Sequence, residues 1–279
     1  MELFYPIELA FTHFLQNLGS WLLPIMRIFT FFGNEEFYLL VMPILYWCVD
    51  AALGLRIGIM LVLSGTLNGI MKLIFKRPRP YWIDKTVTAH ISESSFGMPS
   101  GHAMNAMSVW GLFAASVPKK AIKTVSIVLI VMVGISRIYL GVHFSSDVFV
   151  GWLLGGLLLI LYLRNEKRIS MWVKELPLGR LVFILFFISL VLIGLGALSL
   201  ATPGNWEIPP SWLETAAMTD PSGEINPLSL EGTISNAAIF FGLTSGAACI
   251  HFLGGFNNQG TWQQHILKFL IGLCGIVIL

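Results

Sequence analysis

The stretch RIGIMLVLSGTLNGIMKLIFKRPRP, residues 56–80, begins as an apolar segment and ends in a cluster of cations. Its apolar part, Arg56–Phe75, is long enough to cross a membrane as a helix. The polar side chains Ser64, Asn68 and Lys72 recur at a spacing of four, so they share one face of that helix. We expect Ser64 and Asn68 to form hydrogen bonds to neighbouring helices. The stretch therefore predicts a spanning helix that brings the positive charge of Lys72 to one face of the bilayer.

The rest of the chain has the composition of a helical membrane protein. Of its 279 residues, 56% are hydrophobic and 11% are charged, whereas soluble domains carry about 25% charged residues. Its apolar runs are continuous, which excludes the alternating strands of an outer-membrane barrel. Further candidate spans are Gly101–Val117, Ile122–Val142, Phe144–Leu163, Leu181–Ala201 and Thr233–Leu253, with Phe37–Asp50, Leu9–Phe32 and His265–Leu279 as short or interrupted candidates. We predict an all-α transmembrane bundle, with a six-span core in residues 1–163 and two to three further spans in residues 164–279.

Charge and cysteine usage narrow the possible partners. A net charge of +2 is too small to indicate nucleic acid, and no basic aromatic patch is present. Cys48, Cys249 and Cys274 all lie in apolar runs, so we expect packing residues rather than disulfides or metal ligands. No carboxylate cluster in the core has metal-ligand spacing, so neither a metal nor another cofactor is expected. The first residues lack the basic region and cleavage site of a signal peptide.

The charged connections predict an orientation. Val117–Thr124 and Arg164–Arg180 are rich in lysine and arginine, whereas Thr202–Glu231 is acidic and has neither. By the positive-inside rule, the first two are expected to be cytoplasmic loops and the third an outer linker. Counting spans from these loops places the Lys76–Pro99 and Val142–Phe144 turns outside as well. The first of these turns is basic, against the rule, and we attribute its position to anion binding.

Three short motifs lie at the ends of different predicted spans, all on one face of the bilayer. They are Lys72-x6-Arg79-Pro80, Pro99-Ser100-Gly101-His102 and Ser136-Arg137-x5-His143-x3-Asp147. A charged cluster in apolar surroundings is costly and therefore indicates function. Guanidinium groups match phosphate oxygens, and a lysine adds a point charge. A Ser-Gly helix start presents free N–H groups to an anion. Together the motifs predict a phosphate-handling site.

Two histidines and a carboxylate supply the reactive groups. His143 and Asp147 are four residues apart, so they share a face if a helix has begun. A carboxylate on one imidazole nitrogen fixes the tautomer and leaves the other nitrogen as a nucleophile. Such a pair alone is more often a capping or surface pair, but Arg137 just upstream favours the functional interpretation. Gly151-x3-Gly155 is interpreted as a helix-packing motif.

In order and spacing, the three motifs match the signature of the type-2 phosphatidic acid phosphatase superfamily, so the chain resembles that family across Lys72–Asp147. The superfamily includes membrane lipid phosphatases and shares its core with vanadium haloperoxidases. The segment GNEEFY, residues 33–38, also resembles one found in the sphingosine-phosphate phosphatase branch. The resemblance covers the six-span core and says nothing about residues 181–279.

The resemblance implies a role for each motif residue. The residues expected to bind the phosphoryl oxygens are Lys72, Arg79, Ser100, Gly101 and Arg137. His143 would attack phosphorus and become a phosphohistidine, and Asp147 would orient it. His102 would protonate the leaving oxygen and then activate water. Fixed cations would replace Mg²⁺, which implies a metal-independent reaction.

We therefore expect a multi-pass phosphatase of the cell membrane that hydrolyses a lipid phosphate or diphosphate at the outer leaflet. The substrate candidates are phosphatidic acid, phosphatidylglycerol phosphate, sphingoid phosphates and polyprenyl diphosphates. Two alternatives stay open. A lipid phosphotransferase would use the same intermediate, and an anion transporter would need only a basic vestibule, although no internal repeat supports one. Neither the lipid nor the oligomeric state follows from the sequence.

Overall fold

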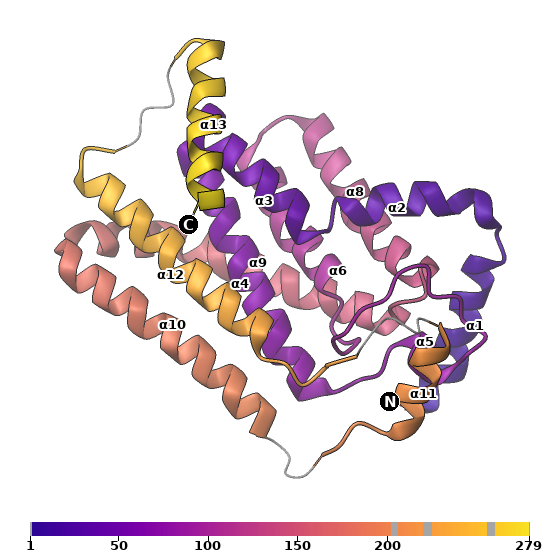
Figure 1. Ribbon diagram of the computed structural model, residues 1–279. Coiled ribbons are helices and arrows are strands. Elements are labelled where there is room, and N and C mark those ends of the chain that lie inside the picture. The colour runs from indigo at the N-terminus through magenta and orange to yellow at the C-terminus, as the bar shows by residue number, and fades with distance from the viewer. Residues whose placement is uncertain (1, 202–205, 220–224, 256–259, 279) are drawn as a thin grey trace.

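The computed structural model describes residues 2–201, 206–219, 225–255 and 260–278, and within these ranges the chain forms helices and turns with no strand. The elements are η1 (Glu2–Phe4), α1 (Tyr5–Gln16), η2 (Ser20–Leu22), α2 (Leu23–Phe31), α3 (Glu35–Ile44), η3 (Leu45–Val49), α4 (Ala51–Phe75), α5 (Pro80–Ile83), α6 (Gly101–Asn105), η4 (Ala106–Trp110), α7 (Gly111–Ser116), α8 (Lys120–Tyr139), α9 (Ser145–Glu175), α10 (Leu178–Ala201), α11 (Pro210–Thr219), α12 (Glu231–Phe252) and α13 (Trp262–Ile278). The predicted all-α class is confirmed (Figure 1).

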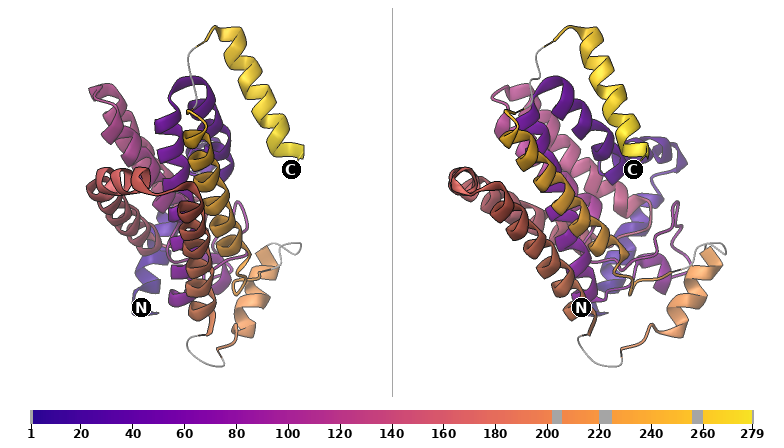
Figure 2. Two further views of the ribbon diagram at one scale, coloured as in Figure 1. Left: turned by 90° about the vertical axis from the view of Figure 1, so that its left-hand side faces the viewer. Right: turned by 60° about the vertical axis from the view of Figure 1, so that its left-hand side comes forward.

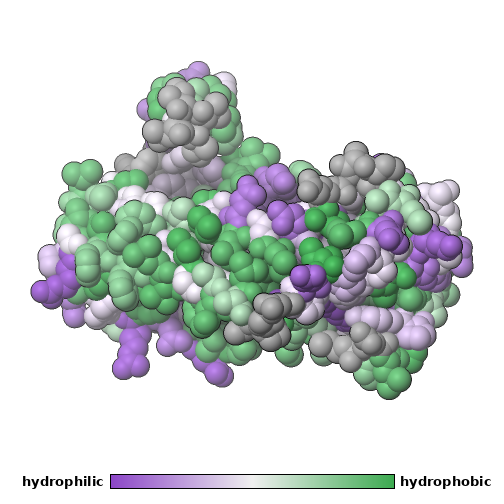
Figure 3. All heavy atoms as spheres, turned by 60° about the horizontal axis from the view of Figure 1, so that its bottom comes forward, coloured by the Kyte–Doolittle hydropathy of each residue, from purple (hydrophilic) through white to green (hydrophobic). Residues whose placement is uncertain are grey.

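Among the described residues, five helical segments are long and apolar enough to cross a membrane. These segments are Ala51–Ile83, Lys120–Tyr139, Ser145–Glu175, Leu178–Ala201 and Glu231–Phe252. Ser20–Phe31 and Glu35–Val49 make a sixth if this pair, bent by 49°, forms one broken span. Large apolar side chains are exposed on the outer helices, for example Val125, Phe149 and Phe183. Hydrophobic residues also cover much of the face shown in Figure 3, as expected of a multi-pass membrane protein.

The expected helix over residues 101–117 forms from α6, η4 and α7, where η4 is a π-helical turn. It ends at Ser116 and is shorter than the five spanning segments. The interrupted candidate Leu9–Phe32 is not one helix, because the chain turns at Gly19 with a φ of 116° between α1 and α2. The last candidate forms α13, which lies against η3 and α3 at the edge of the bundle (Figure 2).

α4 is the central helix of the bundle, and its polar face is buried as the spacing predicts. Ser64 Oγ donates to Asn105 Oδ1 at 2.7 Å, and Asn68 Nδ2 donates to the Pro99 carbonyl at 3.0 Å. Both predicted interhelical hydrogen bonds are thus confirmed. The second bond ties α4 to the turn that opens α6, so it helps to fix the Pro99-Ser100-Gly101-His102 motif against Lys72.

The glycine pair on α9 brings that helix onto α6. A Cβ atom added at Gly151 would lie 2.7 Å from the Ser100 carbonyl, and one at Gly155 would lie 2.6 Å from the Met104 carbonyl. Neither position has room for a larger residue, so the helix-packing interpretation is confirmed. This close approach places the start of α9, which carries Asp147, beside the start of α6.

The two ends of the bundle differ in chemistry. At one end, Arg56 on α4 donates to Ser116 Oγ at 3.1 Å and pairs with Glu166 on α9, 2.6 Å from Oε1. The end of α4, the start of α6, the end of α8 and the start of α9 meet at the opposite end, which holds all three motifs. The three motifs thus share one end of the bundle, and their place on one face of the bilayer stays a prediction.

Two predicted loops have more structure than expected. Arg164–Arg180 is not a loop, because α9 continues to Glu175 and α10 begins at Leu178. No proline or glycine interrupts the chain between Arg164 and Leu176, so the helix continues to the turn at Pro177. Its charged side chains do not end it, because a helix can carry charges where it extends beyond the bilayer. Thr202–Glu231 is not a simple linker, because it contains α11, which packs on α5. Its acidic positions 220 and 224 lie outside the described residues.

The three cysteines are free thiols. Cys48 is half-buried, whereas Cys249 and Cys274 are exposed on the protein surface rather than packed in a core. On an outer helix of a membrane bundle, such positions can face lipid, which is as apolar as a protein core. A continuous apolar run does not distinguish these two surroundings.

Candidate active site

The basic motif after α4 is formed by a sharp reversal of the chain. Lys76 ends the helix in the left-handed conformation, with a φ of 47°, and Arg79 precedes the short helix α5. The segment then runs over the bundle and returns so that the Gly97 amide donates to the Arg77 carbonyl at 2.8 Å. A Cβ atom at Gly97 would lie 2.8 Å from the Pro78 carbonyl, so this return requires glycine.

All three predicted cations converge on the segment Glu93–Phe96. Lys72 Nζ donates to Ser95 Oγ at 2.7 Å, and Arg79 Nε donates to the Ser95 carbonyl at 2.6 Å. Glu93 pairs with both arginines: its Oε2 lies 3.3 Å from Arg79 Nη2, and its Oε1 contacts Nη2 of Arg137. The two arginine side chains are 0% and 1% exposed, so their charges are almost fully removed from water. The cluster has the concentration of positive charge that a phosphate dianion requires.

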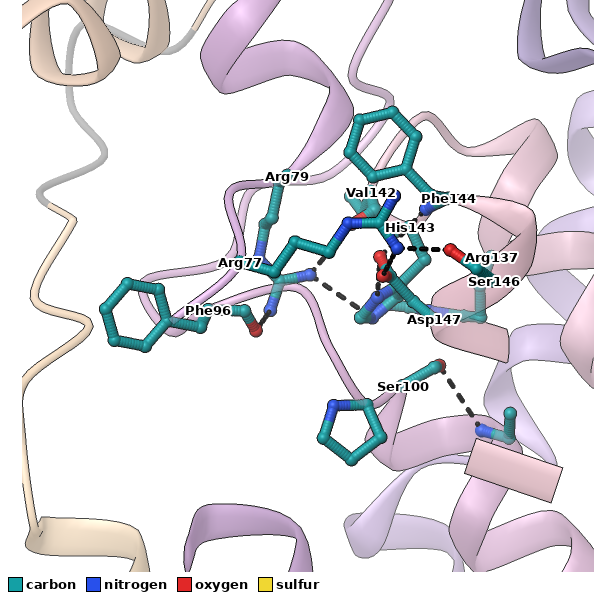
Figure 4. A network of polar contacts seen from close by, with 12 residues as sticks. Arg77, Arg79, Phe96, Ser100, Arg137, Val142, His143, Phe144, Ser146 and Asp147 are labelled. Atoms are coloured by element: carbon teal, nitrogen blue, oxygen red, sulfur yellow. Dashed lines mark hydrogen bonds and ion pairs between the residues drawn. The ribbon is translucent and has the colours of Figure 1, made fainter. Parts of the chain in front are cut away.

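His143 lies in the turn between α8 and α9, outside both spanning helices, with its two ring nitrogens in different surroundings. Nε2 is 3.2 Å from Arg79 Nη1, and Nδ1 is 3.5 Å from Asp147 Oδ2 (Figure 4). A guanidinium group can only donate, so Nε2 accepts and the ring proton sits on Nδ1, facing the carboxylate. The sequence-based pairing of His143 with Asp147 thus corresponds to a tautomer with a nucleophilic lone pair beside Arg79.

The charge state of His143 also suits a nucleophile. Burial, followed by the positive charges of Arg79 and Arg137, holds the pKa of His143 well below its ordinary value. The imidazole is therefore neutral at pH 7, and its Nε2 lone pair, which accepts from Arg79 in the substrate-free protein, is not protonated.

Asp147 is anchored by groups other than the histidine. Its Oδ2 accepts from the Phe144 amide at 2.9 Å, which caps the start of α9. Its Oδ1 accepts from Arg77 Nη1 at 3.0 Å, and Arg77 also contacts Ser146 (Figure 4). Arg77 pairs with Glu8 as well. The sequence analysis counted Arg77 only among the anion-binding charges of its basic turn, and it missed Glu8. An acidic residue beside the first apolar run was the available signal for Glu8, because a buried charge needs a partner.

The Pro99-Ser100-Gly101-His102 motif opens α6 as predicted. The Ser100 side chain caps the helix by accepting from the Ala103 amide at 3.4 Å, and it is fully buried. His102 Nε2 lies 2.6 Å from Asn34 Oδ1, in the GNEEFY segment. Gly101 lies against Asn68, because a Cβ atom added at Gly101 would be only 3.1 Å from Asn68 Oδ1.

These residues surround a cavity of about 580 Å³. Of the predicted site residues, those that line it are Lys72, Gly101, His102, Arg137 and His143. Arg79, Ser100 and Asp147 lie behind this wall, and Arg79 reaches His143 from there. The cavity brings two histidines and a set of fixed cations together in a space large enough for a phosphorylated headgroup. Within the described ranges, no group of three or more His, Cys, Asp or Glu side chains is arranged to hold a metal ion.

Glu93 is the other residue that sequence reasoning missed, and it also lines the cavity. Burial alone would raise the pKa of Glu93, but Arg79 and Arg137 overcome that effect and hold the pKa of this carboxyl well below its ordinary value. An ionised carboxylate therefore sits between the two guanidinium groups expected to bind phosphate. A lone glutamate between two basic motifs was the only sequence signal for it.

Comparison with known proteins agrees with the family resemblance that the three motifs indicate. Residues 53–171 match the family model described as the PAP2 superfamily. Phosphatidylglycerophosphatase B of Bacillus subtilis (strain 168) is 40% identical over 124 residues, which cover 40% of this chain and 59% of that protein. Sphingosine-1-phosphate phosphatase 1 of Mus musculus is 31% identical over 149 residues, which cover 50% of this chain and 35% of that protein. The matches thus span between about a third and three fifths of these two relatives.

The comparison with solved structures also gives a match. The crystal structure of a transmembrane PAP2 type phosphatidylglycerolphosphate phosphatase from Bacillus subtilis has 29% sequence identity and a TM-score of 0.48, covering 60% of this chain and 94% of that chain. The matched family model ends inside α9, so the later helices α10 to α13 lie beyond it.

Proposed function

We propose that this membrane protein, whose residues 53–171 match the PAP2 superfamily model, hydrolyses a lipid phosphate or diphosphate through a phosphohistidine intermediate. The observation that carries the proposal is the placement of His143 Nε2, 3.2 Å from Arg79 Nη1 and beside a cavity lined by Lys72 and Arg137. A nucleophile next to fixed positive charge is what phosphoryl transfer requires, since catalysis there is mainly positioning and charge stabilisation.

In the proposed reaction, the phosphoryl group of the substrate replaces Glu93 between the cations. His143 Nε2 attacks phosphorus, and a P–N bond forms as the bond from phosphorus to the lipid oxygen breaks. His102 gives a proton to that oxygen. Water then attacks the phosphohistidine and gives its proton to His102, the P–N bond breaks, and inorganic phosphate leaves. Asp147 stabilises the positive charge that His143 carries in the intermediate.

The proposed reaction uses no metal ion. Lys72, Arg79 and Arg137 neutralise the oxygens of the phosphoryl group, the task that Mg²⁺ performs in many phosphoryl transferases. Lys72 and Arg137 project from α4 and α8, and Arg79 is fixed by hydrogen bonds to the carbonyls of Ser95, Phe96 and Val142. Held by helices and backbone, these charges are already in place when substrate arrives.

The test is phosphate release by the purified protein across lipid classes. The panel contains phosphatidic acid, phosphatidylglycerol phosphate, sphingosine 1-phosphate and a polyprenyl diphosphate in matched detergent micelles. His143→Ala serves as the blank, with its folded state checked by size-exclusion chromatography. Release from at least one lipid by the wild type and from none by His143→Ala is expected. Equal release by both proteins would refute the proposal, and phosphate delivered to an added alcohol instead of water would identify a phosphotransferase.

We propose that the site faces the outside of the cell membrane, or the lumen of an internal one. The lysine-rich start of α8 and the basic end of α9 lie at the end of the bundle opposite the motifs, which supports a cytoplasmic position for both. In a background without the native cysteines, Glu214→Cys on α11 is expected to react with an impermeant thiol reagent on intact cells, and Lys120→Cys is not. The reverse labelling pattern would place the site on the inner leaflet.

A further inference from the structure

The catalytic cavity has a wall that comes from outside the family core. Residues of the C-terminal segment line part of it, although they lie more than fifty residues beyond the end of the family match at residue 171. The residues of this wall are Asn226, Pro227, Ser229, Glu231, Gly232, Thr233 and Asn236. None of these residues belongs to the three-part motif, so this wall would contact a part of the substrate other than the phosphate.

The wall is fixed in place by both backbone and helix packing. The Asn226 amide donates to the Ser94 carbonyl at 3.0 Å, which ties the segment to the stretch that holds the cations. α12 packs on α4 at a pair of glycines, since a Cβ atom at Gly69 would lie 2.5 Å from Thr233 Oγ1. Thr233 is 2% exposed. The start of α12 is therefore a rigid part of the cavity and not a loosely attached extension.

Asn236 is the polar side chain that this packing presents to the cavity. Its amide lies over Gly65, where an added Cβ atom would meet Nδ2 at 2.7 Å and Oδ1 at 3.0 Å. Nδ2 donates to the Gly232 carbonyl at 3.0 Å, one turn back along α12. Within the described part of the chain, Oδ1 accepts no hydrogen bond, so it can accept one from a ligand, and the second N–H of Nδ2 can donate.

We propose that the start of α12, through the amide of Asn236, selects lipid phosphates that carry a hydroxyl or ester group beside the phosphate. This inference rests on the proposed phosphatase function. Glycerolipid and sphingoid phosphates have such groups within a few bonds of phosphorus, whereas a polyprenyl phosphate continues directly as hydrocarbon. Asn236 is half-buried in the cavity wall, and an amide with unused hydrogen-bonding capacity there favours a substrate that can pair with it. The C-terminal segment thereby determines specificity, and the motifs determine the reaction.

The test compares two substrates with one phosphate each, dioleoyl phosphatidic acid and farnesyl monophosphate, in the same micelles. The measured quantity is the ratio of their kcat/KM values. Asn236→Leu removes the amide at similar volume, and Ser235→Leu on the exposed side of the same helix is the matched control. We expect Asn236→Leu to lower the ratio about fivefold to tenfold, the effect of one lost hydrogen bond, mainly through the KM for phosphatidic acid. Ser235→Leu is expected to leave the ratio within twofold.

Inhibition by inorganic phosphate shows whether the cation cluster is intact. Its inhibition constant is expected to stay within twofold in Asn236→Leu, because Asn236 contacts none of the three cations. If Asn236→Leu does not yield folded protein, Asn236→Ala decides the question with the same readout. An unchanged ratio, or an equal loss for both substrates, would overturn the inference while leaving the phosphatase proposal in place. Release by the wild type from none of the lipids of the panel above the His143→Ala blank would instead reject the proposed function.

Discussion

In the proposed reaction, Glu93 occupies the position that the phosphate of a substrate needs, so removing its charge is expected to tighten anion binding. In the substrate-free protein its carboxylate lies 3.3 Å from Arg79 Nη2 and also pairs with Arg137. An incoming phosphate must displace this carboxylate from both guanidinium groups. Glu93→Gln keeps the size and one acceptor oxygen of the side chain and removes the competing charge.

The expected effect follows from the distance and the exposure. Coulomb attraction between unit charges 3.3 Å apart is about 5 kcal/mol at an effective dielectric constant of about 20. Much of this is recovered when the displaced carboxylate is hydrated, because the Glu93 side chain is already 24% exposed. A net gain of about 1.4 to 2.8 kcal/mol remains, which corresponds to a tenfold to hundredfold tighter complex.

The assay is the inhibition constant for inorganic phosphate and for orthovanadate, measured against turnover of a soluble aryl phosphate. Glu36→Gln removes a charge from the cavity wall without touching either arginine and is expected to change both constants less than threefold. The assay measures binding of the anions and not turnover, because turnover also depends on the positions that the two arginine side chains take after the substitution. An unchanged or weaker affinity of Glu93→Gln for both anions would refute the reasoning and show that Glu93 holds the arginines in place for the substrate.

His102→Ala is expected to slow phosphoenzyme formation from lipid alkoxides by 10²- to 10⁴-fold, and from an activated aryl phosphate far less, because only a poor leaving group needs the proton; an equal defect with both substrates in rapid-quench experiments would exclude the general-acid role. Activity is expected to survive EDTA and to be blocked by orthovanadate, since fixed cations hold the oxygens, and an absolute Mg²⁺ requirement after chelation would contradict this. Arg77→Met is expected to destabilise the detergent-solubilised protein by about 3–5 kcal/mol, because it leaves Asp147 and Glu8 buried without their shared cation; an unfolding midpoint equal to that of the wild type would show that the carboxylates are stable without it.

The part of the site that could be predicted from sequence is the part carried by helix ends. Lys72 and Arg137 close spanning helices, and His102 and Asp147 open others. Because the spans alternate in direction, counting them was enough to place these residues on one face. The Ser64 hydrogen bond and the glycine packing of α9 followed in the same way from helical spacing.

The residues that could not be predicted depend on the paths of loops and on the C-terminal segment. Glu93 reaches Arg79 only because the connection between α5 and α6 folds back over the bundle. Glu8 reaches Arg77 only because α1 packs beside α9. Asn236 carries no motif, and its place in the cavity follows from the packing of α12 on Gly65. In each case the sequence shows the residue but not its partner.

The account depends most directly on His143 as the nucleophile. The measurement is a rapid base-quenched reaction with ³²P-labelled substrate, followed by peptide mapping of the labelled residue at alkaline pH. The account predicts label on the peptide that contains His143, stable to base and lost in acid as expected of a phosphohistidine, and no label in His143→Ala. Label on a serine or an aspartate, or full activity of His143→Ala without a trapped intermediate, would contradict it.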